Sequence, residues 1–108
     1  MSYRQCLVAA VLVVSVLAST SSLALAPTFT TIDVPGASTT VAVGINNRGQ
    51  IVGKYLAGGR NHGFVLDKGT FTTIDVPGAL GTQAFGINAR GQIVGDYGAD
   101  RTHGFLLD

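Results

Sequence analysis

Cysteine and tryptophan are almost missing from this chain, which has one cysteine and no tryptophan in 108 residues. The single cysteine, Cys6, lies before a long apolar run and not at its end, so it is not placed as a lipid attachment site. The rest of the chain has no thiol chemistry and no disulfide framework. Packing and hydrogen bonds alone must therefore stabilise the small domain that it forms.

Neither sign of charge predominates, because seven Lys and Arg residues stand against six acidic residues. A nucleic-acid surface needs clustered basic residues, and single strands also need aromatic rings for stacking. The chain lacks both patterns, so we expect no nucleic-acid partner. It also lacks Gly-x-Ser-x-Gly, Gly-x-Gly-x-x-Gly and P-loop motifs, so the sequence predicts no cofactor and no identifiable catalytic site.

The first 26 residues have the pattern of an export signal. Arg4 supplies a positive charge, residues 7–18 form the apolar run, and small or polar residues follow. Cleavage after Ala24 is preferred, because cleavage after Ala26 would leave Pro27 at the new N-terminus. The sequence therefore predicts a secreted or periplasmic protein.

An uncleaved membrane anchor is the alternative, since residues 7–26 are long enough to cross a bilayer. The polar residues 19–22 argue against it. We therefore expect no membrane attachment after cleavage.

An internal repeat fills nearly all of the chain beyond this signal. Residues 29–57 align without a gap with residues 71–99, which lie 42 positions later, and most of the aligned pairs are identical. A period of this length is typical of solenoids, propellers and arrays. We therefore divide the remaining chain into two tandem β-repeats, residues 27–70 and 71–108.

Each repeat contains four short segments of strand character. Asn46 is expected to begin a tight turn that places Gly49 at a positive φ, and Asp67-Lys68-Gly69 closes a second hairpin. Residues 56–61 are predicted to form a looser link. The expected strands of the first repeat are Val41–Asn46, Gln50–Tyr55, His62–Leu66 and Thr70–Val76.

The faces of these segments indicate how the sheets pack. The strands over 41–46 and 50–55 carry apolar residues on both sides, so we expect both faces of the sheet to be covered. Small residues on one side allow a neighbouring sheet to approach closely. The sequence predicts an all-β fold of two four-stranded antiparallel repeats that resemble propeller blades.

The repeats begin in an unusual phase, because Phe29–Val34 matches a fourth strand and precedes the first one. The expected strand order along the chain is therefore 4-1-2-3-4-1-2-3. The early strand is suited to complete the last sheet of its own or a neighbouring chain. A piece of a longer array is the alternative.

The repeated motifs resemble the bacterial probable extracellular repeat family that is named for a His-Ala-Phe signature. The resemblance implies an exported protein with a propeller-like β-repeat, and it implies no catalytic or binding residues. Glycine replaces the alanine of the signature in both copies. The motifs are Gly-Ile-Asn-x-x-Gly-Gln-Ile-Val-Gly at 44–53 and 86–95, His-Gly-Phe at 62–64 and 103–105, and Phe-Thr-Thr-Ile-Asp-Val-Pro-Gly-Ala at 29–37 and 71–79.

Four residues are candidates for binding. Arg48 and Arg90 lie at predicted hairpin tips, where they are suited to anionic sugars or a partner protein, although solvated charge is the ordinary role. Tyr55 and Tyr97 end predicted strands, where their rings are suited to stack on a sugar, although core packing is the ordinary role.

The repeated histidines and aspartates are weaker candidates. A metal site formed by His62 and His103 lacks the usual ligand spacing, and no cysteine or carboxylate ligands accompany them. Asp33 and Asp75 resemble the carboxylate pair of glycoside hydrolases. An aspartate two residues before Pro-Gly, however, more commonly stabilises a turn.

These observations favour an exported structural or interaction module that is not an enzyme. The alternative is a lectin-like carbohydrate-binding propeller fragment. Two repeats bury little surface for a domain without cross-links, so we expect a homo-oligomer, for example a ring of three chains. A glycan or a cell-surface protein is the expected external partner.

Overall fold

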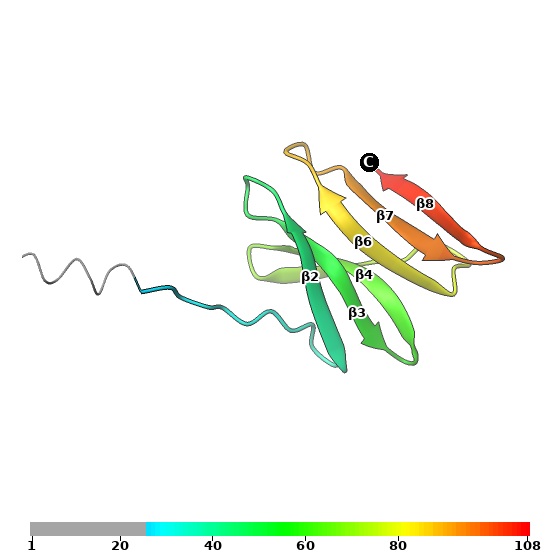
Figure 1. Ribbon diagram of the computed structural model, residues 1–108, viewed down its shortest axis with the longest axis horizontal. Helices are drawn as coiled ribbons and strands as arrows, with labels where there is room; N and C mark the ends of the chain where they lie inside the picture. The colour runs from blue at the N-terminus through cyan, green and yellow to red at the C-terminus, as the bar shows by residue number, and fades with distance from the viewer. Residues whose placement is uncertain (1–25) are drawn as a thin grey trace, which may run out of the picture. The chain divides into compact units, whose positions relative to one another are not determined.

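The computed structural model describes residues 26–108, and the predicted signal lies outside this part except for its last residue. The preferred cleavage point after Ala24 therefore also lies outside the described residues. All strands fall within residues 32–108, which form a unit of their own (Figure 1). The described residues contain no helix long and apolar enough to cross a bilayer.

The first sheet is a four-stranded antiparallel meander in the order β2-β3-β4-β5 (Figure 1). Each strand pairs with the next one along the chain, because short turns connect them. The all-β prediction is confirmed, and so are the four strands of this sheet. Its strands are β2 (Thr39–Ile45), β3 (Ile51–Ala57), β4 (Arg60–Asp67) and β5 (Thr70–Ile74).

The turn between β2 and β3 has the predicted form. The Gly49 N–H donates to the Asn46 carbonyl oxygen at 3.1 Å, and Gly49 has a φ of 79°. The Asn46 side-chain oxygen accepts the backbone N–H groups of Arg48 and Gln50, at 3.1 and 2.9 Å. Asparagine therefore satisfies the turn's backbone donors, while glycine adopts the left-handed conformation at little cost.

The link over 56–61 is tighter than predicted. β3 continues to Ala57, which pairs directly with Arg60, and only Gly58 and Gly59 separate the two strands. Both glycines have positive φ values, of 61° and 77°. Two consecutive residues with positive φ form the hairpin turn whose twist matches that of its flanking strands, so this pair makes a two-residue turn and not a loose loop.

The second sheet has three strands in the order β6-β7-β8, where four were predicted. The predicted strand Phe29–Val34 is also wrong, because no residue from 26 to 34 is in a strand. A strand requires a neighbouring edge for its hydrogen bonds, and none pairs with these residues. The two sheets are open, and they do not close a ring. The strands are β6 (Gly81–Ile87), β7 (Ile93–Gly98) and β8 (Thr102–Leu107).

The two sheets pack face to face through a small apolar core. Val52 and Ile74 of the first sheet meet Ala84 and Ile93 of the second. Small residues bring the backbones close together, because a Cβ on Gly44 would lie 3.1 Å from the Phe85 carbonyl oxygen. Larger residues at this contact would hold the sheets apart.

Only one face of each sheet packs against another sheet within residues 32–108, which corrects the expectation that both faces are covered by neighbouring sheets. Val52 is fully buried between the sheets, whereas Val94, its repeat counterpart, is 49% exposed. The two valines occupy equivalent positions in β3 and β7. They differ because the sheet β6–β8 covers Val52, while the face of β6–β8 that carries Val94 has no neighbour in the structure.

Both sheets contain the same β-bulge, which depends on a glycine. The register between β2 and β3 shifts between Ala42 and Gly44, so that Val43 is an extra residue. Gly53 of β3 lies opposite Ala42. A Cβ on Gly53 would overlap the Val41 carbonyl oxygen and the ring of Phe64. Only glycine fits beneath the Phe64 ring, which is completely buried.

Gly53→Ala is therefore expected to separate β2 from β3 and to lower the free energy of unfolding by about 1–3 kcal/mol, the usual cost of overpacking. Gly98→Ala is the matched control, since nothing lies within 4 Å of a Cβ there and its φ is not in the left-handed region. Chemical denaturation of both variants checks this. Equal stabilities would mean that the bulge tolerates a side chain.

Candidate functional site

The asparagine and glutamine of the repeated motif build the hairpins. The Asn46 side-chain amide donates to the Gln50 side chain at 2.8 Å, and Gln50 donates to Asp67 at 3.2 Å. The second repeat has the same chain of bonds from Asn88 through Gln92 to Asp108, at 2.8 and 3.2 Å. These four hydrogen bonds lie within each sheet, so the repeated asparagine and glutamine have a structural role.

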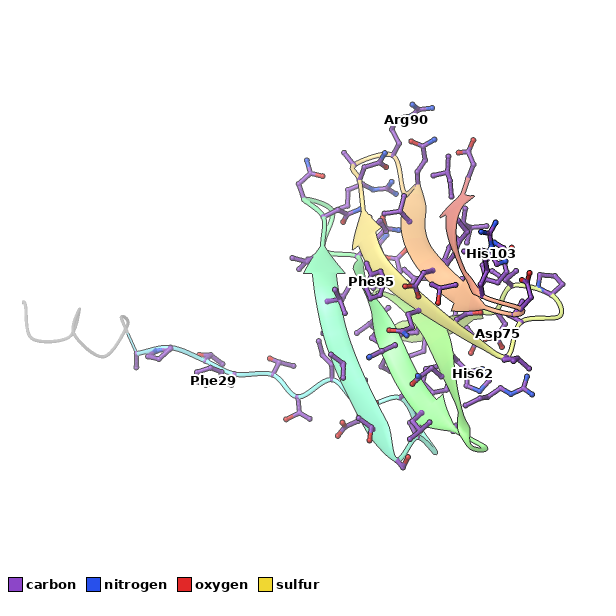
Figure 2. The ribbon with its side chains drawn as sticks, turned by 45° about the vertical axis from the view of Figure 1, so that its right-hand side comes forward. Phe29, His62, Asp75, Phe85, Arg90 and His103 are labelled. Atoms are coloured by element: carbon purple, nitrogen blue, oxygen red, sulfur yellow. The ribbon has the colours of Figure 1, made fainter. Side chains whose placement is uncertain are left out.

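The structure brings the two arginine-bearing hairpin tips together. Asn46 donates to the Asn88 carbonyl oxygen at 2.9 Å, and Arg48 donates to the Ala89 carbonyl oxygen at 3.5 Å. Arg90 points away from the sheets at the second tip (Figure 2). Arg48 therefore takes part in the contact between repeats, while Arg90 stays exposed.

The candidate tyrosines stack on the repeated histidines. The ring centroids of Tyr55 and His62 lie 5.0 Å apart at 23°, and those of Tyr97 and His103 lie 5.1 Å apart at 26°. The Tyr55 hydroxyl also lies 2.7 Å from the Thr73 hydroxyl. One face of each tyrosine ring is thus covered by an imidazole and is closed to a sugar.

His62 is held by Asp75 on the neighbouring strand end. Its Nδ1 lies 2.9 Å from both carboxylate oxygens of Asp75 (Figure 2), and its Nε2 lies 3.2 Å from the Ala57 carbonyl oxygen. In a catalytic triad, the nitrogen remote from the aspartate faces a nucleophile. Here that nitrogen faces a backbone carbonyl, so the pair has no group to activate.

The equivalent histidine has a different partner. His103 Nε2 lies 2.8 Å from Asp100, three residues earlier. This hydrogen bond holds the pKa of the Asp100 carboxyl below its ordinary value. Because the folded-state pKa is lowered, the interaction stabilises the fold above the unfolded pKa, and this contribution is lost as the pH falls through the folded pKa.

The predicted pairs do not form a common site. His62 and His103 each bond a different carboxylate, and Asp75 bonds His62 while Asp33 is exposed. Within residues 26–108, no three His, Cys, Asp or Glu side chains are close enough to hold a metal ion.

Sequence reasoning missed a polar pocket between the sheets, of about 330 Å³. The sequence pattern that could have indicated this pocket is the recurrence of Arg60 as Arg101. The one-residue deletion between the repeats obscures this recurrence. The pocket is shallow, and Arg60 also donates to the Ala79 carbonyl oxygen at 3.4 Å. Its lining includes Arg60, Asn61, Gln83, Asp96 and Thr102.

In comparisons with known proteins, no family model, no curated protein and no solved structure matches this chain.

The role of Asp75 is testable against its own repeat. Asp75→Asn is expected to lower the free energy of unfolding by about 1 kcal/mol, because it weakens a charge-assisted hydrogen bond. Asp33→Asn, in an identical sequence context, is expected to change it by less than about 0.5 kcal/mol, since the two histidines bond Asp75 and Asp100 and not Asp33. Thermal and chemical unfolding at low protein concentration measure both. Equal losses would contradict the assignment.

Proposed function

We propose that this chain is an exported structural or interaction module without a catalytic site, of the extracellular repeat family that it resembles. One observation carries the proposal: equivalent sheet faces are buried in one repeat and exposed in the other. Val94 is 49% exposed where Val52 is fully buried, and Leu106 on the same face is 62% exposed. Exposed apolar surface of this kind marks an interaction site.

The polar motifs support a structural role for the rest of the chain. The repeated asparagines and glutamines bond within their hairpins, and His62 bonds Asp75 and a backbone carbonyl. None of these groups is left facing an open pocket with a nucleophile. The geometry therefore supports binding by sheet faces more than chemistry at a site.

Carbohydrate binding is the second proposal, and the polar pocket beside Arg60 and Asp96 is the observation that favours it. It is the weaker proposal, because histidines cover one face of the Tyr55 and Tyr97 rings. Screening the purified chain on a glycan array decides it, since no bound glycan would exclude the lectin role.

The interaction proposal predicts that a charge on the exposed sheet face weakens association. Val94→Lys is expected to raise the dissociation constant at least about tenfold, a cost of about 1.4 kcal/mol, because the ammonium group would be desolvated. Ala99→Lys adds the same charge at an exposed loop position and serves as the control. Sedimentation over a concentration series measures this. Identical profiles for both variants would contradict the role of this face.

Export predicts a defined mature chain. Mass spectrometry of the product recovered outside the cytoplasm is expected to give an N-terminus at Leu25, because the small-x-small pattern ends at Ala24. An N-terminus at Pro27 would move the cleavage point and keep export. Full-length chain in the membrane fraction would contradict the proposal.

A further inference from the structure

β8 is an unpaired sheet edge. It is the last strand in the order β6-β7-β8, whereas its repeat counterpart β4 pairs with β3 on one side and β5 on the other. Leu106 and Leu107 on this strand are 62% and 43% exposed. β8 carries no proline or lysine, the residues that commonly protect an edge from pairing. Its free N–H and C=O groups are open to a further strand.

An apolar pocket of about 420 Å³ adjoins this edge, between the two sheets. One wall comes from the first sheet and the other from the second. Side chains of a strand added to β8 would point into this space, because alternate residues of such a strand face the first sheet. The lining includes Val65, Thr72, Ile74, Ile93, Phe105 and Leu107.

The chain also contains a strand sequence without a partner. Residues 28–32 are identical to β5, residues 70–74, yet they form no strand. Phe29 is 91% exposed, whereas its counterpart Phe71 is partly buried and packs edge-on against Phe64 at 5.6 Å. Residues 28–31 are exposed, and a segment with the sequence of an edge strand matches the strand that β8 lacks.

The turn that follows this segment is already formed as it is after β5. The Ala37 N–H donates to the Val34 carbonyl oxygen at 3.1 Å, and the Ala79 N–H donates to that of Val76 at 3.0 Å. The hydroxyls of Thr40 and Thr82 each accept the N–H of the valine in the preceding turn, Val34 and Val76 respectively, at 3.1 Å. The turn before β2 therefore has the same hydrogen bonds as the turn that connects β5 to β6.

We propose that residues 28–32 of a second copy of this chain pair with β8 as the fourth strand of the second sheet, and that Phe29 of that copy fills the apolar pocket. Residues 28–32 precede β2, and β2 and β8 lie on opposite sides of the unit 32–108 in both views (Figures 1 and 2). A second copy is therefore better placed to donate it than the same chain. The inference rests on the proposed interaction role and names the partner.

The pairing register follows from that of β4 with β5. In the first sheet, Val65 lies opposite Thr72 and Leu66 opposite Phe71. The repeat places Leu106 opposite Thr30 of the second copy, and Leu107 opposite Phe29. Asp33 of that copy then stands where Asp75 bonds His62, within reach of His103.

This contact is head-to-tail, because the donated strand and the accepting edge are different surfaces. It also brings the face that carries Val94 against the outer face of the second copy's first sheet. That packing repeats the one already made within each chain between β2–β5 and β6–β8. The contact therefore continues an interface that the fold itself contains.

Phe29→Ala tests the occupant of the pocket. Self-association, measured by sedimentation of the full chain, is expected to weaken about tenfold or more, while thermal unfolding at low concentration stays unchanged because Phe29 is exposed. Phe71→Ala is the matched control, expected to lower the melting temperature. The double change Thr30→Pro with Thr31→Pro removes two consecutive N–H groups of the donated strand, one of which would face β8, and is expected to abolish association.

Cross-linking tests the register. In a Cys6→Ser background, chains with Thr30→Cys mixed with chains with Leu106→Cys are expected to form a disulfide-linked pair at least about tenfold faster than Thr30→Cys mixed with Gly104→Cys. The first pair is directly opposite, whereas the second is two residues out of register and too far apart for a disulfide.

Equal cross-linking of the two mixtures, or association unaffected by Phe29→Ala and the proline changes, would overturn strand donation. If Val94→Lys still abolished association in that case, the interaction role would stand and only the donated strand would fail. A wild-type chain that stays monomeric at every concentration would overturn both.

Discussion

The fold depends on the close approach of two sheets whose contact residues are too small to hold them apart. Gly44 and Gly63 of the first sheet leave room for the backbone of β6, because a Cβ on either would lie within 3.4 Å of it. Close backbones allow Val52, Ile74, Ala84 and Ile93 to form one core. Since both sheets have the same sequence pattern, the same contact is available again on each outward face, and one chain satisfies it only once.

The repeated polar residues serve this packing. Asn46 and Asn88 each complete a turn, and Asn46 also reaches the backbone of the second turn. His62 and Asp75 connect the end of the first sheet to the start of the link between the sheets. Residues that are candidate catalytic or metal-binding groups in the sequence therefore form hydrogen bonds at the ends of strands.

Much of the first sheet could be predicted from the sequence, because its turns depend on local chemistry. Asn46 and Gly49 specify one turn, and Lys68 with Gly69 specifies another, in which even Lys68 adopts a positive φ of 50°. The Gly58-Gly59 turn was predicted as a loose link, because a glycine pair fits both a flexible loop and a two-residue hairpin.

The strand at 29–34 and the covering of both sheet faces were predicted wrongly for a different reason. Sequence pattern reports that a segment is suited to pair or to be buried, whereas pairing and burial need a partner surface. Phe29 and Phe71 have the same neighbours in sequence, yet only Phe71 lies beside another strand. The histidine partners were likewise unpredictable, because His62 and His103 differ in the length of the preceding turn and not in their motif.

The meander order of the sheets has a consequence for folding kinetics. Every strand pair joins segments that are adjacent in the chain, with turns of a few residues, so loop closure costs little entropy within a sheet. Proteins dominated by such local pairings have low contact order and fold fast for β proteins. Each hairpin thus becomes complete as soon as its second strand is available, and within residues 32–108 the docking of the two sheets is the step that joins distant parts of the chain.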